Sequence, residues 1–162
     1  MTHETVGVQG HLLLEVADGS GRVVHRCRGA NTLLEGGRLM LARLLAGEAR
    51  EPEFAMTLGG GDTDTSPTMR GLAKESAIRP VAVKKARTKE AVVILQASFP
   101  VAEAEETIAE AGLTVTYKTG LTTVTELYNR VRVQPALKLK AGETLSATWE
   151  LSFSPISAVK EG

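Results

Sequence analysis

The segment LSATWELSF near the C-terminal end alternates strictly between apolar and polar residues. Its apolar members are Leu145, Ala147, Trp149, Leu151 and Phe153. Because successive side chains of an extended strand point to opposite faces, these five side chains share one face. The pattern predicts a strand that packs one face on a hydrophobic core and exposes the other to solvent, with Trp149 in the core.

Further segments with strand-like composition are separated by short turn signals. The pair Asp18-Gly19 is one such signal, because Gly tolerates the positive φ of a tight turn, and it predicts a hairpin over residues 8–28. The remaining strands are predicted at residues 53–58, 77–87, 90–99, 107–117, 120–128, 130–140 and 143–153. Short strands at this spacing predict a mainly β fold, either an antiparallel β-sandwich or a barrel-like domain.

One helix is predicted in the N-terminal half, over residues 33–46. Leucines recur there at helical spacing, and Gly47 follows as a typical residue after a helix C-terminus. Thr32 and Glu35 have the spacing of a capping box, which predicts that the Thr32 hydroxyl caps the first turn.

A chain of 162 residues can bury a sufficient core without metals or disulfides. We expect a single domain over residues 1–162, with the hairpin and helix first, a β-rich body at residues 53–154, and flexible ends. The one cysteine, Cys27, cannot form an intramolecular disulfide. The first residues lack a basic region followed by an apolar stretch, so we expect no signal peptide and synthesis in the cytoplasm.

The charge distribution argues against some classes of partner. Nineteen Lys and Arg residues balance nineteen Asp and Glu residues, and the balance holds in both halves of the chain. A nucleic-acid-binding protein normally gathers basic charge on one face, so we expect no nucleic acid partner. The apolar stretches are far shorter than the ~20 residues that span a bilayer, so we also expect no membrane insertion.

A glycine-rich loop is the most conspicuous candidate for chemistry. Residues 59–70 (GGGDTDTSPTMR) lack the pattern of a phosphate-binding loop. They also fail as a calcium loop, because Pro67 and Ala73 replace the required Gly and Glu. We interpret the segment as a flexible, exposed connection. The alternatives are ion binding and contact with another subunit, the latter through Gly59, Gly60, Gly61, Asp62, Asp64 and Arg70.

We interpret three other groups of polar or reactive side chains as structural and not as catalytic. Cys27 and His25 share a strand face, but no orienting Asn or Asp is evident, so we interpret Cys27 as a small packed residue. The glutamates at residues 103–110 are interpreted as a solvated face, and the basic run at residues 84–87 as a protected strand edge. We therefore expect no enzymatic activity, and no catalytic, cofactor-binding or metal-binding residues.

The order of several motifs is more specific than any single residue. The motifs are Asn31 before the helix, FAMTLGGG at Phe54–Gly61, GLAKE at Gly71–Glu75 followed by Arg79, TIAEAGL at Thr107–Leu113, LYNRV at Leu127–Val131, and LSATWELSF at Leu145–Phe153. In this order they resemble a family of small structural proteins of bacteriophage tails. Members of that family are associated with tail fibres or baseplates, and relatives occur in phage-derived contractile injection systems.

The resemblance implies a non-enzymatic assembly subunit of a virion or injection particle. Such a subunit would associate with itself, as a trimer or hexamer, and dock to other tail or baseplate proteins. Two alternatives are a capsid decoration protein and a carbohydrate-binding fibre tip, the latter with Phe54, Tyr117 or Tyr128 as sugar contacts. A third is an enzyme with an unusual site at Cys27 or at residues 103–110.

The motif residues also suggest a structural ion pair. Arg130 is placed to pair with Glu75 or Glu110 and so hold two strands in register. The competing interpretation is an exposed charge on a strand, which contributes little to stability when it is solvated. Gly112, at the entry to a predicted strand, permits a bulge or a close backbone approach.

Overall fold

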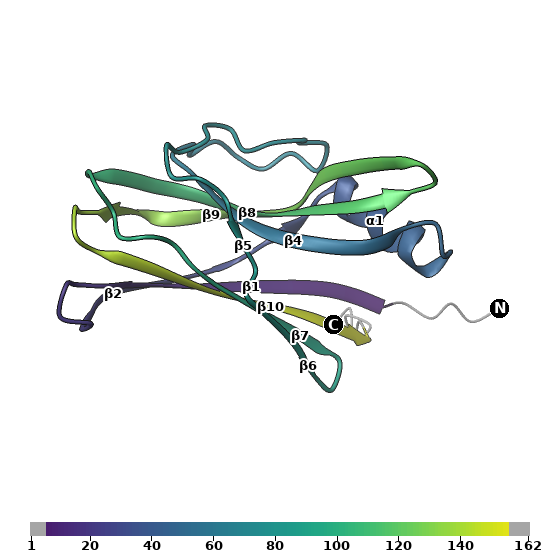
Figure 1. Ribbon diagram of the computed structural model, residues 1–162, viewed down its shortest axis with the longest axis horizontal. Helices are drawn as coiled ribbons and strands as arrows, with labels where there is room; N and C mark the ends of the chain where they lie inside the picture. Colours follow the sequence, from purple (N-terminus) through teal and green to yellow (C-terminus); the bar gives the residue numbers. More distant parts are fainter. Residues whose placement is uncertain (1–5, 156–162) are drawn as a thin grey trace, which may run out of the picture.

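The alternating segments form two five-stranded antiparallel sheets, which pack face to face as a sandwich with one short helix (Figure 1). The computed structural model describes residues 6–155, so the ends predicted to be flexible lie largely outside it. In spatial order, sheet A contains β2 (Val23–Ala30), β1 (Val6–Ala17), β10 (Thr144–Pro155), β7 (Val92–Ser98) and β6 (Lys85–Lys89). Sheet B contains β3 (Thr32–Leu33), β9 (Thr122–Leu139), β8 (Glu106–Thr119), β4 (Arg50–Gly59) and β5 (Val81–Ala82).

The chain passes between the sheets at both sides of the sandwich. On one side β2 leads directly into β3 through Asn31, and on the other β5 leads into β6. The predicted N-terminal hairpin is confirmed as β1 and β2, and the Asp18 carboxylate accepts hydrogen bonds from the Ser20 and Arg22 N–H groups in its turn. The predicted mainly β fold is confirmed, and of the two predicted forms, sandwich and barrel-like domain, the structure is the sandwich.

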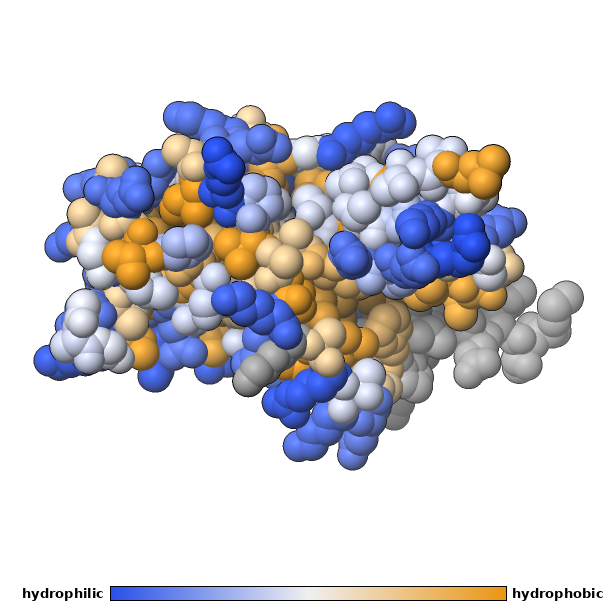
Figure 2. Space-filling model, in the orientation of Figure 1, coloured by the Kyte–Doolittle hydropathy of each residue, from blue (hydrophilic) through white to orange (hydrophobic). Residues whose placement is uncertain are grey.

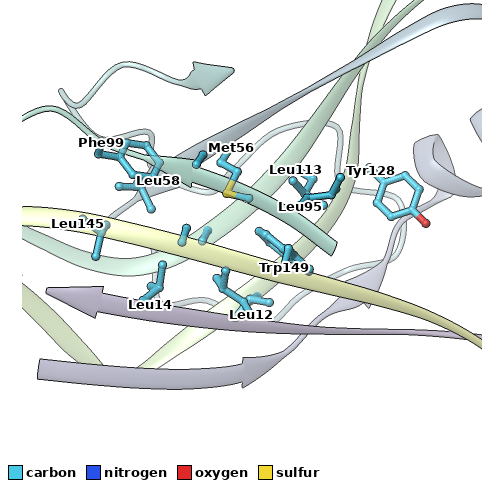
Figure 3. Close-up of a cluster of buried hydrophobic side chains, with 14 of the residues drawn as sticks. Leu12, Leu14, Met56, Leu58, Leu95, Phe99, Leu113, Tyr128, Leu145 and Trp149 are labelled. Carbon is cyan, nitrogen blue, oxygen red and sulfur yellow. The ribbon is translucent and has the colours of Figure 1, made fainter. Parts of the chain in front are cut away.

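The hydrophobic core lies between the sheets (Figure 3). The alternation in β10 is confirmed, because Leu145, Ala147, Trp149 and Leu151 are all buried. They pack in one cluster with the inward side chains of β1 and of sheet B, among them Leu12, Leu14, Met56, Leu58, Leu113 and Val115. Burying each large apolar side chain stabilises the fold by roughly 1.5–3 kcal/mol.

The helix is shorter than predicted and begins differently. Helix α1 spans Glu35–Leu45, and Thr32 belongs to β3. The capping-box prediction is wrong, because Leu34 is the N-cap and makes no side-chain cap hydrogen bond. Instead, the Glu35 N–H donates to the Pro67 carbonyl, so a distant loop satisfies the helix end. Gly47 follows the helix with a φ of 74°, as predicted for a glycine directly after a helix C-terminus.

Two strand predictions need correction. Residues 77–87 are not one strand, because β5 pairs in sheet B and β6 in sheet A. The two strands predicted at residues 120–128 and 130–140 are one long strand, β9, which runs from Thr122 to Leu139. Its pairing with β8 shifts register at Ile108/Glu110 and at Leu113/Thr114, and the second shift faces residues 127–129, where the two predicted strands were divided.

A long segment after β4 forms a third layer. Residues 60–76, which we call the covering loop, lie over the outer face of sheet B (Figure 1). A side chain on Gly112 of β8 would lie within 3.2 Å of Leu72, which shows how closely the loop approaches the sheet. Glu110 and Arg130 lie between the loop and sheet B.

Candidate functional site

Glu110 and Arg130 occupy adjacent strands on the outer face of sheet B. In the register, Glu110 of β8 lies opposite Gly59 of β4, and Arg130 of β9 lies opposite Gly112. A Cβ atom on Gly59 would stand 2.5 Å from the Glu110 Oε1 atom, so only glycine fits beside this carboxylate. The glycine-rich motif and the glutamate motif therefore meet in one place.

The two side chains form a buried ion pair. Arg130 Nε donates to Glu110 Oε2 at 2.8 Å, and both side chains are 0% exposed. The carboxylate also accepts three backbone N–H groups of the covering loop, from Gly61 at 3.1 Å, Ala73 at 3.0 Å and Lys74 at 2.7 Å. Charge-assisted hydrogen bonds of this kind are about twice as strong as neutral ones, and together they offset the cost of burying the charge.

The guanidinium binds the other part of the same loop. Arg130 Nη1 donates to the Thr63 carbonyl and to Thr65 Oγ1, each at 2.8 Å, and Nη2 reaches the Gly61 carbonyl at 3.4 Å. Its neighbour Arg132 pairs with Asp64 at 2.7 Å, closer to solvent. One ion pair thus holds both the first part of the loop, at residues 61–65, and its last part, at residues 73–74.

These contacts change how the predicted site residues are understood. Arg130 pairs with Glu110, and Glu75 is exposed and not the partner. The prediction that residues 59–70 are a flexible, exposed connection is wrong at the start of the segment, because Gly59 and Gly61 are buried and tethered. Glu110 does not belong to a solvated face of glutamates.

The outer part of the loop matches its prediction better. Asp62, Asp64 and Arg70 are exposed, whereas Gly60 is half-buried. The loop therefore presents its polar tip to solvent on a fixed base, which is the geometry that a contact surface needs.

A second polar network lies on the inner side of β9 and was missed in the sequence. Asn31 Oδ1 accepts hydrogen bonds from Trp149 Nε1 at 2.7 Å and from Asn129 Nδ2 at 3.1 Å. Asn129, which is 0% exposed, also accepts from the Leu113 N–H at 3.0 Å. The available signal was an asparagine next to the motif arginine in the segment LYNRV.

The catalytic alternatives receive no support from local chemistry. Cys27 is half-buried, and burial raises the pKa of its thiol, which disfavours the reactive thiolate.

Among residues 6–155, no group of three or more His, Cys, Asp and Glu side chains is arranged to hold a metal ion. Within the same residues, no helix is long and apolar enough to cross a membrane.

The candidate sugar-binding aromatics lie mostly in the interior. Tyr117 and Tyr128 are each 1% exposed, and Phe54 stacks edge-on against Tyr128 with ring centroids 5.8 Å apart. The Tyr117 hydroxyl donates to Glu126 and accepts from Arg43, which ties α1 to sheet B. The Tyr128 hydroxyl has no partner among the described residues, and burial raises its pKa to about 12.

Comparison with known proteins gave no match, whether the chain was compared with protein-family models, with curated sequences or with solved structures.

Proposed function

We propose that this chain is a non-enzymatic structural subunit of a bacteriophage tail or of a phage-tail-like contractile injection particle. It acts by self-association, as a trimer or hexamer, and by docking to tail or baseplate components. The observation that carries the proposal is the structural role of the motif residues. Residues from five of the motifs, namely Asn31, Gly61, Glu110, Asn129, Arg130 and Trp149, hydrogen-bond to one another in the two buried networks.

Side chains used in this way stabilise architecture. Glu110, Asn129 and Arg130 are each 0% exposed, and their hydrogen bonds end within the chain, so they cannot contact a substrate. Their effect is to fix the covering loop on a rigid sheet. A rigid β-scaffold that positions an exposed loop is suited to repeated protein–protein contacts in a particle.

Between the two binding alternatives, the burial of Tyr117 and Tyr128 favours the capsid decoration protein. Carbohydrate sites present exposed aromatic rings, and these two rings lie in the interior. A decoration protein would use the same scaffold on a different shell, and only its location in a particle separates it from a tail subunit.

Labelling of particles tests the proposal. Particles are isolated from the host by density-gradient centrifugation and treated with gold-coupled antibodies raised against this chain. We expect gold along tail-like structures in negative-stain micrographs. Gold on the shell would support the decoration protein instead. Particles without gold, with the chain recovered only as free protein, would contradict both assignments.

A further inference from the structure

The turn between β8 and β9 carries an apolar side chain at its tip. Thr119 pairs with Thr122, so Gly120 and Leu121 form a two-residue turn, and Gly120 has the positive φ of 58° that such turns require. Leu121 is 109% exposed, more than in an extended chain. The turn lies at one end of the sandwich (Figure 1), where a hydrophobic group projects from the surface (Figure 2).

An apolar groove lies where β8 begins. It has a volume of about 440 Å³ and lies between residues 77–81, before and within β5, and residues 100–106, between β7 and β8. Ile78, Val81 and Ala102 are partly buried in it and contact the core. At its rim Val101 is 58% exposed.

The two features cannot meet within one molecule. β8 has 14 residues, begins beside the groove at Glu106 and ends at Thr119 next to the turn. At about 3.4 Å per residue, the strand separates them by more than 40 Å. The turn can therefore enter this groove only on a second copy of the chain.

The charges of the two ends favour this encounter. Glu103 and Glu106 line the groove with one cation, Arg79. At the turn, Arg50 Nη2 donates to the Gly120 carbonyl at 3.0 Å, and Lys118 pairs with Glu51 at 2.8 Å, so the three charged side chains nearest the turn in these contacts carry one net positive charge. Opposite charges on two surfaces steer their association and fix its orientation.

We infer that copies of this chain associate head to tail, with Leu121 of one copy inserted into the groove beside Val101 of the next. The two surfaces are different patches, so the contact repeats from copy to copy and forms a closed ring or a filament. This inference rests on the proposed self-association and names the surfaces that perform it.

Directed cross-linking tests the contact. Two variants are prepared in a Cys27→Ser background, one with Leu121→Cys and one with Val101→Cys, and a short bismaleimide is added to their mixture. We expect a heterodimeric cross-link in the mixture and little product from either variant alone. Val24→Cys, at an exposed position on edge strand β2, replaces Val101→Cys as the matched control and should give no product.

Sedimentation velocity provides an independent measurement. Leu121→Asp and Val101→Asp should each weaken self-association at least about tenfold, whereas Val24→Asp should leave it unchanged. Both test positions are exposed, so circular dichroism should show intact folds. Leu121→Cys homodimers, or association that survives both aspartates, would overturn the head-to-tail contact.

The two proposals fail separately. A chain that stays monomeric up to about 1 mM contradicts the head-to-tail contact. If antibodies still label tail-like particles in that case, the chain docks to other components and the proposed function stands. A chain that forms the Leu121–Val101 cross-link but labels no particle keeps the contact and loses the function.

Discussion

The outer faces of the two sheets differ in what covers them. On sheet A, outward side chains such as His11, Ser146 and Glu150 are exposed to solvent. On sheet B, the covering loop buries the corresponding face around Glu110 and Arg130. The same fold thus contains one sheet whose outer face is solvated and one sheet whose outer face is partly buried by the covering loop.

This difference determines whether apolar and polar residues alternate along a strand. β10 alternates, because only one of its faces contacts apolar neighbours. In β8 the six consecutive residues of the segment 108–113 are buried, and its alternation disappears. A strand covered on both faces must satisfy any polar side chain internally, which explains why Glu110 carries four hydrogen bonds.

The largest effect is expected from breaking the buried pair beneath the covering loop. Arg130→Ala leaves the Glu110 carboxylate without its cation in a buried site, and we expect it to lower the free energy of unfolding by about 3–5 kcal/mol. Urea denaturation followed by circular dichroism measures the loss.

The neighbouring arginine is the matched control. Arg132 pairs with Asp64, whose side chain is 97% exposed, so Arg132→Ala should cost less than about 1 kcal/mol. Similar losses in both variants would mean that the loop does not exclude water from Arg130, and the contrast between the two outer faces would disappear.

The contrast between the two outer faces also explains which parts of the fold could be predicted from the sequence. The hairpin of β1 and β2, the core face of β10 and the presence of one helix were correct, because local spacing records one-sided burial. The covering loop was misjudged, since no periodicity in GGGDTDTSPTMR shows that distant side chains bind its backbone. Residues 77–87 were joined because a strand that changes sheets remains extended.

The candidate site was predictable only in part. Arg130 and Glu110 were among the residues considered for an ion pair, on motif order and charge. Their burial, and the choice of Glu110 over Glu75, depend on the path of the covering loop. The Asn31 network was missed because it joins three segments that only the folded chain brings together.

A smaller loss is expected from the inner side of β9, where the polar groups lie against the core. Asn31→Ala removes the acceptor shared by the Asn129 amide and the Trp149 indole and leaves two buried donors unsatisfied. Both donors are neutral, so each falls in the lower part of the usual range, at about 1–2 kcal/mol, and we expect a loss of about 2–4 kcal/mol in chemical denaturation.

Thr32→Ala is the matched control at the adjacent position. Thr32 is exposed and does not cap α1, so the substitution should change the free energy of unfolding by less than about 0.5 kcal/mol. A loss of about 1 kcal/mol, typical of a removed N-cap, would restore the capping box that the structure contradicts.

Alkaline pH probes the buried Tyr128 hydroxyl, which has no hydrogen-bond partner within residues 6–155. The pKa of Tyr128 is raised to about 12 by burial, whereas an unfolded tyrosine titrates near 10. Below pH 10 both states are protonated and stability is complete. Between pH 10 and 12 the unfolded state loses its proton first, so about 2–3 kcal/mol of stability should be lost.

Tyr128→Phe isolates this contribution from other groups that titrate at high pH. The variant removes only a hydroxyl without a partner, so it should be at least as stable as the natural chain at pH 7. Its stability should fall less steeply above pH 10 in parallel urea titrations. Identical alkaline slopes would show that the Tyr128 hydroxyl is solvated.

The smallest loss of stability is expected from a substitution on the solvent-exposed outer face of sheet A. Arg26 of β2 pairs with Glu15 of β1 at 2.9 Å, and the Arg26 side chain is 65% exposed. Water and salt screen such a pair, so Arg26→Ala should cost less than about 1 kcal/mol, and 1 M NaCl should abolish most of that difference. The Arg130→Ala loss should persist in the same salt, because ions cannot reach a charge that the covering loop buries. Equal salt sensitivity of the two variants would place Arg130 in contact with solvent.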